Sequence, residues 1–243
     1  MYSTSSPSIL PQLKSFWRSE FTDWSLNEII CISSVFITVP LLSIVIDGFG
    51  FMALASSLTG IAYTLLAGKG KSSCYLFGTV NVILYGIICY QNKVYGDMLL
   101  NLAYYLPMQI AGFFLWIRNR DAATGTIIRK KLSWTNRIYF LAGTAALWCI
   151  GAFLLRLAEA ASPWLDSATT VISIAAMLLG VMRCFEQWIG WSLVNGISVI
   201  MWLKLWHDGN GSLATVLMWG IFFICGIVFA VQWYKSGSCG ERS

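Results

Sequence analysis

A short stretch of the chain carries side chains that could recognise an aromatic ligand: Trp188, Trp191 and Asn195. Successive residues of an α-helix are about 100° apart, so Trp191 would lie about 60° from Trp188, and Asn195 about 20°. The three side chains would share one face, with Asn195 about 10 Å further along the helix than Trp188. Indole rings stack on aromatic ligands and attract cations, and an amide supplies directed hydrogen bonds. The spacing therefore predicts a row of rings that leads to an amide.

Three further amide side chains lie within apolar stretches: Asn81, Asn101 and Gln109. A single buried amide between membrane helices is more often a structural contact, which contributes about 0.6 kcal/mol. Four amides beside many Tyr and Trp residues favour a pocket for an uncharged or weakly charged aromatic ligand.

The elements that must position these residues are membrane spans. Of the 243 residues, 57% are apolar and only 11% are charged, whereas a soluble domain has about 25% charged residues. A membrane-spanning helix needs about 20 mainly apolar residues. The sequence predicts eight such helices, at 29–47, 50–68, 74–91, 97–117, 138–158, 166–182, 187–206 and 212–234.

The sixteen Lys and Arg residues predict the orientation of these spans. When loops are assigned alternately to the two sides, three basic residues fall on one side: Lys93, Arg156 and Lys204. The other thirteen fall on the side of the termini. Basic residues concentrate in cytoplasmic loops, so both termini are predicted to be cytoplasmic. The charge lies in short loops and does not form a surface for nucleic acid.

Residues 1–28 are predicted to form an amphipathic segment at the membrane surface, because Leu10, Leu13, Trp17, Phe21 and Trp24 recur at helical spacing. The seven Cys residues form no CxxC pair, and His207 has no nearby residue of ligand type. We therefore expect no metal and no cofactor. No nucleophile–base pair is evident in the spans, so an enzyme is not expected.

Two parts of the chain have the same organisation of three spans with short loops. A shift of 114 residues places Asn81 on Asn195 and Gly112 on Gly226. Four crossings separate equivalent helices, so the repeats would be parallel, with a binding site between them near the midplane. The predicted fold is all-α with six segments: 1–28, an extra N-terminal span 29–47, the first repeat 50–117, a basic loop and linker span 118–165, the second repeat 166–235, and a tail 236–243.

The charged residues also restrict the mechanism. No Asp or Glu lies centrally in a span, and a pump driven by protons or sodium usually keeps a carboxylate in its path. Coupling to an ion gradient is therefore disfavoured. Pro107 lies within the fourth span, where it removes a backbone hydrogen bond and is predicted to kink the helix.

The pattern Trp188-x-x-Trp191-x-x-x-Asn195, together with the run 75–81 and the basic loop, resembles the Pnu-type vitamin transporters, in particular the PnuC nicotinamide riboside transporters. The resemblance covers about residues 50–235. It implies a fold similar to the SWEET sugar transporters, a homotrimer in the bacterial inner membrane, and facilitated diffusion of nicotinamide riboside, which is phosphorylated inside the cell. By position, Trp188, Trp191 and Asn195 would be the main ligand contacts, with Asn81, Asn101 and Gln109 as further contacts.

Cys74 and Phe77 stand where the second repeat has its two Trp residues. We therefore expect most of the stacking on the second repeat. Two alternatives remain open at this point: a transporter for another vitamin such as thiamine or riboflavin, and a membrane sensor or scaffold that moves no solute.

Overall fold

The computed structural model describes residues 17–20, 22, 24–121, 124–157, 163–236 and 238–239. Most of these residues are helical, and the rest lie in loops and in one pair of two-residue strands. The elements are α2 (Leu26–Asp47), α3 (Phe51–Lys69), α4 (Cys74–Gln91), α5 (Tyr95–Leu99), the π-helix η1 (Leu100–Tyr105), α6 (Leu106–Arg118), β1 (Lys130–Lys131), α7 (Trp134–Leu157), α8 (Pro163–Val181), α9 (Gln187–His207), α10 (Leu213–Ser236) and β2 (Ser238–Cys239).

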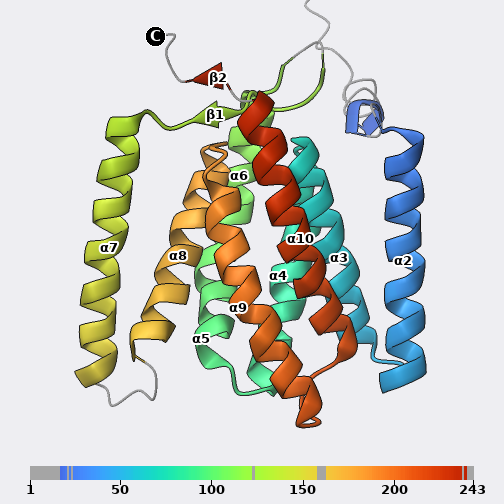
Figure 1. Ribbon diagram of the computed structural model, residues 1–243. Helices are drawn as coiled ribbons and strands as arrows, with labels where there is room; N and C mark the ends of the chain where they lie inside the picture. Colours follow the sequence, from blue (N-terminus) through green and yellow to red (C-terminus); the bar gives the residue numbers. More distant parts are fainter. Residues whose placement is uncertain are drawn as a thin grey trace, which may run out of the picture.

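Within the described residues, seven helical segments are long and apolar enough to cross a membrane, and α5, η1 and α6 together form one of them. The eighth predicted span corresponds to α8, whose apolar part Asp166–Val181 is shorter than the others. Figure 1 shows α8 running between α7 and α9 through the same layer as the other helices. The prediction of an all-α integral membrane protein is confirmed, and the predicted ends lie within a few residues of the observed ones.

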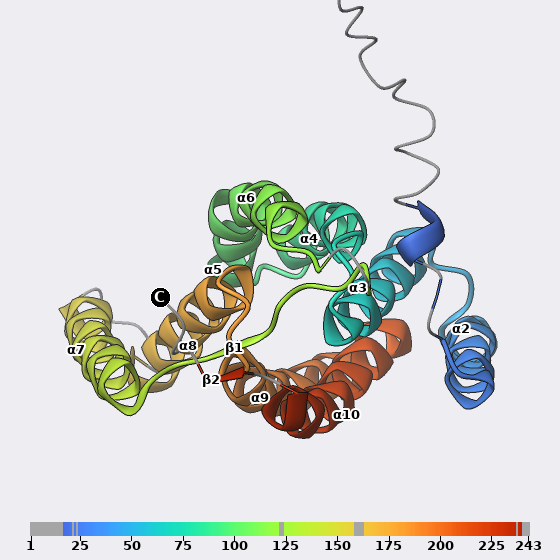
Figure 2. The same cartoon turned by 90° about the horizontal axis from the view of Figure 1, so that it is seen from above.

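Six spans form a closed ring around a central axis, as Figure 2 shows from above. The first repeat comprises α3, α4 and α5–α6, and the second comprises α8, α9 and α10. The repeats meet at two places, where α10 packs on α3 and where α6 packs on α8. These two contacts are equivalent under the predicted repeat, because each joins the third helix of one repeat to the first helix of the other. The two parallel repeats are therefore confirmed.

The remaining spans, α2 and α7, stand outside this ring (Figures 1 and 2). The extra N-terminal helix α2 packs mainly against α10, and the linker helix α7 packs against α8. Both expose large apolar side chains, such as Val45 (73%) on α2 and Tyr139 (71%) on α7. Water would be an unfavourable solvent for such surfaces, so these faces must contact lipid or another protein.

Local sequence explains where several helices begin and bend. Helix α2 begins with a capping box, in which Ser25 and Glu28 each bond the other's backbone N–H. Helix α3 ends at Gly70, whose φ of 78° suits a residue without a Cβ. The six-residue π-helix η1 directly precedes α6, and Pro107 stands in the first turn of α6. A π-helical turn is a recognised way to absorb a helix irregularity.

The described ends of the chain lie on one side of the ring, which we call the terminal side; the opposite side is the distal side (Figure 1). A strap formed by the basic loop crosses the terminal side and contacts both repeats. The Ile127 N–H donates to the Gly70 carbonyl (3.0 Å), and the Lys130 N–H donates to the Arg183 carbonyl (2.9 Å). Strand β1 in this strap pairs in parallel with β2 near the C-terminus.

The N-terminal segment also contacts the terminal side of the ring. Glu20 is fully buried, forms an ion pair with Arg120 (2.8 Å) and accepts a hydrogen bond from the Ser73 N–H (3.1 Å). Part of the polar face of the amphipathic segment predicted at residues 1–28 therefore packs against the helical ring of the same chain. Leu10, Leu13 and Phe21 lie outside the described residues.

Two buried clusters close different parts of the ring. The terminal cluster contains residues from all six ring helices, and among its rings are Tyr75, Trp116, Phe185, Trp188, Phe229 and Trp233. Two indoles of this cluster join the repeats, since Trp116 Nε1 donates to the Gly180 carbonyl (3.0 Å) and Trp233 Nε1 donates to the Gly68 carbonyl (2.7 Å). The distal cluster joins α3, α4, α9 and α10 and also includes Val39 of α2. In it, Trp202 Nε1 donates to the Tyr85 hydroxyl (2.7 Å).

Candidate functional site

A cavity of about 530 Å³, the central cavity, lies between the two repeats. Each of the six residues predicted to bind a ligand lines it, so the structure brings all of them together. The first repeat contributes Asn81, Asn101 and Gln109, and the second contributes Trp188, Trp191 and Asn195. The cavity is enclosed on the terminal side by the terminal cluster, to which Trp188 belongs.

The two amides that the repeat places on each other have different surroundings. Asn81 Nδ2 donates to the Ser56 carbonyl on α3 (2.8 Å) and approaches Ser56 Oγ at 3.3 Å. Asn195 is only 4% exposed, yet its side-chain amide makes no hydrogen bond to any other residue that the structure describes. A buried polar group without a partner is costly. Asn195 is therefore the amide most clearly available to a ligand, whereas Asn81 already joins two helices.

Three more polar atoms on the cavity wall are buried and lack a hydrogen-bond partner among the described residues. They are Oε1 of Gln109, Nε1 of Trp188 and Nε1 of Trp219. They are one acceptor and two donors. Asn101 differs from them, since its Nδ2 donates to the Asp97 carbonyl one turn earlier (2.8 Å). The residues of the three unpartnered atoms line the cavity, but these atoms are covered by the protein in this state, and Gln109 Oε1 lies against Gly78 of α4. A ligand would therefore need a side-chain rearrangement to bond them.

Aromatic side chains from both repeats form much of the cavity wall. Tyr63, Tyr85 and Tyr105 come from the first repeat, so the rings are more evenly divided than predicted. The ring of Tyr105 lies against Trp191, with centroids 5.8 Å apart and planes tilted by 59°. The asymmetry lies in the ring type, because the first repeat contributes phenols, and the second contributes three indoles and the phenyl ring of Phe222.

Sequence reasoning missed several residues of the wall, among them Trp219 and Ser173. The repeat register contained a signal for the first of these. Trp219 is the residue that a shift of 114 places on Tyr105, and both rings line the cavity. Its position on the third helix of the second repeat could therefore have been inferred.

The prediction that the path holds no carboxylate is wrong. Asp97 and Asp166 line the central cavity, and so does Lys204. All three lie near distal ends of their helices, as the sequence indicated, but the cavity extends far enough along α5, α8 and α9 to reach them. Asp166 and Lys204 are exposed and Asp97 is half-buried. The cavity therefore approaches solvent on the distal side, and its charged wall carries one net negative charge.

The described residues include no group of three or more His, Cys, Asp or Glu side chains that could hold a metal ion. The wall instead combines amides, rings and a few charges at one end. That chemistry suits the reversible binding of a small aromatic molecule.

A ring of two parallel three-helix repeats around a polar cavity defines a membrane transport protein of the small-molecule type. Comparison with known proteins agrees with this class. The family model described as nicotinamide mononucleotide transporter matches residues 50–235. The chain belongs to this family.

Individual relatives extend the match to nearly the whole chain. A nicotinamide riboside transporter PnuC from Neisseria mucosa is 31% identical over 227 residues, which cover 90% of this chain and 86% of that protein. The protein of the same name from Haemophilus influenzae is 27% identical and is covered over 94% of its length. The crystal structure of the vitamin B3 transporter PnuC superimposes with a TM-score of 0.81 at 29% identity, covering 91% of this chain and 96% of that one.

Proposed function

We propose that this chain moves nicotinamide riboside across the membrane by facilitated diffusion, with access to the central cavity alternating between the two sides. The observation that carries the proposal is Asn195, a buried amide without a described partner, on a wall of rings between two repeats. The names of the relatives support the choice of substrate.

The chemistry of the riboside matches this wall. Its carboxamide both donates and accepts hydrogen bonds, as do Asn195 and Gln109, and its ribose hydroxyls do the same. Its ring is a pyridinium cation, so the faces of Trp191 and Tyr105 would attract it by about 0.5–2 kcal/mol. Asp97 and Asp166 would add a long-range attraction at the distal mouth.

The mononucleotide named in the family description differs from the riboside by one phosphate group. That phosphate would have to pass Asp97 and Asp166, and Lys204 is the one basic residue on the described wall. Like charges brought together at a binding site are unfavourable. The electrostatics of the cavity therefore favour the cationic riboside over the nucleotide.

The structure corresponds to a state that is closed on the terminal side. Transport requires that side to open, which means separating the Trp116–Gly180 and Trp233–Gly68 hydrogen bonds and the rings around them. The strap 127–131 touches both repeats there and would have to adjust. On the distal side, opening would separate Tyr85 from Trp202. The π-helix before Pro107 is the candidate hinge within the first repeat.

We propose further that the protein lies in the bacterial inner membrane as a homotrimer, with both termini in the cytoplasm, and that it has no enzymatic activity of its own. The riboside would be retained by phosphorylation inside the cell. The orientation rests on charge: Lys93, Arg156 and Lys204 are the basic residues of the described distal side, and the other described Lys and Arg are on the terminal side.

Cysteine labelling in intact cells tests the orientation. An impermeant thiol reagent is expected to label Asp208→Cys, in the exposed turn after α9, and to spare Arg118→Cys at the terminal end of α6. A control on permeabilised membranes exposes both sides to the reagent. The native Cys184 should give little background labelling there, because burial raises the pKa of its thiol to about 11 and the thiolate is the reactive form. Labelling of position 118 alone would reverse the orientation.

Uptake into proteoliposomes tests the transport proposal itself. The riboside should equilibrate to the external concentration and no further, with or without an imposed proton or sodium gradient. Accumulation above the external concentration that requires a gradient would show coupling and would point to Asp97. Absence of uptake by protein that still binds the riboside would favour a sensor, and preferential uptake of thiamine or riboflavin would change the substrate.

A further inference from the structure

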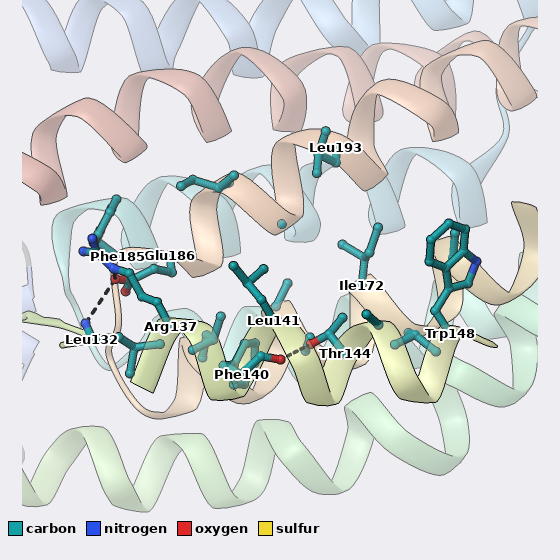
Figure 3. A pocket seen from close by; sticks show the side chains of 18 residues that line it. Leu132, Arg137, Phe140, Leu141, Thr144, Trp148, Ile172, Phe185, Glu186 and Leu193 are labelled. Carbon is teal, nitrogen blue, oxygen red and sulfur yellow. Dashed lines mark hydrogen bonds and ion pairs between the residues drawn. The ribbon is translucent and has the colours of Figure 1, made fainter. Parts of the chain in front are cut away.

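A second cavity of about 600 Å³ lies on the outer surface of the ring, between the linker helix α7 and helices α8 and α9. We call it the lateral groove. No described residue lines both the lateral groove and the central cavity. Figure 3 shows Arg137 and Glu186 at one end of the lateral groove and Trp148 at the other.

The wall of the lateral groove is suited to a hydrocarbon chain. Small residues on α8 and α9 leave space beside α7: Ala168, Ala175, Ala176 and Gly190. Large apolar side chains flank them and remain exposed, with Leu141 at 67% and Leu193 at 56%. Among the described lining residues the one hydroxyl is that of Thr144. It donates to the Phe140 carbonyl of its own helix (2.8 Å) and so needs no partner in the lateral groove.

The length of the lateral groove corresponds to one leaflet of a bilayer. Arg137 and Trp148 are eleven residues apart on α7, which is about 16 Å at a rise of 1.5 Å per residue. Half of a hydrocarbon core of about 30 Å is about 15 Å. The groove thus extends from the headgroup level on the terminal side to about the midplane.

The terminal end of the lateral groove is positively charged. Arg137 lines this end, and Lys130 and Lys131 directly precede the lining residue Leu132 on the strap, with Lys131 Nζ over the Tyr234 ring at 4.4 Å. Glu186 is the acidic residue of the described lining there. Glu186 Oε1 already accepts from Arg137 Nε (2.9 Å) and from the Leu132 N–H (3.0 Å). Three positive charges against one negative charge favour an anionic headgroup over a neutral one.

We propose that the lateral groove is a binding site for an anionic phospholipid of the leaflet on the terminal side. One acyl chain lies between α7 and α8–α9, and the headgroup phosphate faces Lys130, Lys131 and Arg137. The lipid fills the space between the linker helix and the ring. The charge at the mouth and the length of the lateral groove favour a lipid as its occupant over the apolar surface of another protein.

A pair of phenylalanine variants tests the acyl-chain part. Ala145 lines the lateral groove and Ala146 does not, although both are exposed on α7. Native mass spectrometry of purified, delipidated full-length protein, titrated with phosphatidylglycerol, should show one retained lipid per protomer for the wild type and for Ala146→Phe. Ala145→Phe should lose this lipid. Equal retention by both variants would overturn the proposal.

A charge variant tests the headgroup part without altering the groove. Lys131→Gln should weaken phosphatidylglycerol binding roughly fivefold, which corresponds to the contribution of about 1 kcal/mol from one basic residue near an anionic lipid surface. Arg118→Gln, on the same side but at the end of α6, should leave it unchanged. Phosphatidylcholine with the same acyl chains should bind more weakly than phosphatidylglycerol. Equal binding of the two lipids would overturn the proposal. A change in the number of subunits in Ala145→Phe, at unchanged lipid content, would also overturn it, because a second copy of the chain would then be the occupant of the lateral groove.

Discussion

The two equivalent amides of the repeats should respond to the same substitution in opposite ways. Asn195→Ala should weaken riboside binding and leave the fold intact, whereas Asn81→Ala should weaken the fold more than the binding. The difference follows from their partners: Asn81 Nδ2 donates to the Ser56 carbonyl at 2.8 Å, and Asn195 has no described partner within the protein.

The expected loss of affinity in Asn195→Ala can be calculated from the hydrogen-bonding groups of the bound ligand that would lose their partner. Leaving a buried donor or acceptor without its partner costs about 1–3 kcal/mol, which corresponds to roughly a 5- to 150-fold rise in Kd. Stability should not fall, because the substitution removes no hydrogen bond of the protein and Ala is the better helix former.

The magnitude for Asn81→Ala comes from helix contacts in membrane proteins. One interhelical hydrogen bond between buried polar groups contributes about 0.6 kcal/mol. The Ser56 carbonyl also accepts from Thr59 Oγ1 at 3.1 Å, so it would not be left without a partner. The free energy of unfolding should therefore decrease by about this small amount.

Isothermal titration with nicotinamide riboside and thermal unfolding, both on purified protein, measure the two effects separately. The reasoning is refuted if Asn195→Ala keeps the wild-type Kd, or if Asn81→Ala is the variant with the larger loss of affinity at unchanged stability. Asn195→Gln serves as the conservative control, since it retains the amide and should recover part of the affinity.

Three further outcomes follow from the packing and the charges. Gly112→Ala should destabilise the protein by about 1–3 kcal/mol, because its methyl group would overlap a buried tyrosine ring, while Gly143→Ala, with nothing within 4 Å, should be neutral or stabilising in thermal unfolding. Tyr85→Phe should lower the melting temperature, since it leaves the buried Trp202 Nε1–H without its acceptor at a cost of about 1–3 kcal/mol; an unchanged melting temperature would show that this bond does not join the repeats. Asp97→Asn should narrow the preference for riboside over mononucleotide roughly twofold to fivefold in competition binding, and an unchanged preference would remove Asp97 from substrate selection.

Much of this fold was predictable because lipid imposes simple rules. Every span must be apolar, helical and about as long as the hydrocarbon core, so composition alone predicted where the helices lie. The orientation drawn from the loop charges stays a prediction. The six candidate ligand residues converge on one cavity because the repeat places Asn81 and Asn195 on equivalent helices. The helical face shared by Trp188, Trp191 and Asn195 was therefore a sound guide to the cavity wall.

Other features depended on three-dimensional details that residue types do not reveal. Asp97 and Asp166 were read as helix-end residues, but the length of the central cavity brings them into its wall. The pairing of Asn81 with Ser56 depends on how closely α3 approaches α4, which Gly60 permits: a Cβ there would lie 2.7 Å from Asn81 Nδ2. The lateral groove depends on the position of α7 relative to α9, for which the sequence contains no periodic signal.

The most direct test of the central claim is a titration of the purified wild-type protein with nicotinamide riboside and, separately, with nicotinamide mononucleotide. We predict saturable binding of one riboside per protomer and at least tenfold weaker binding of the mononucleotide, whose phosphate would face Asp97 and Asp166. Equal or tighter binding of the mononucleotide, or no binding of the riboside, would contradict the account.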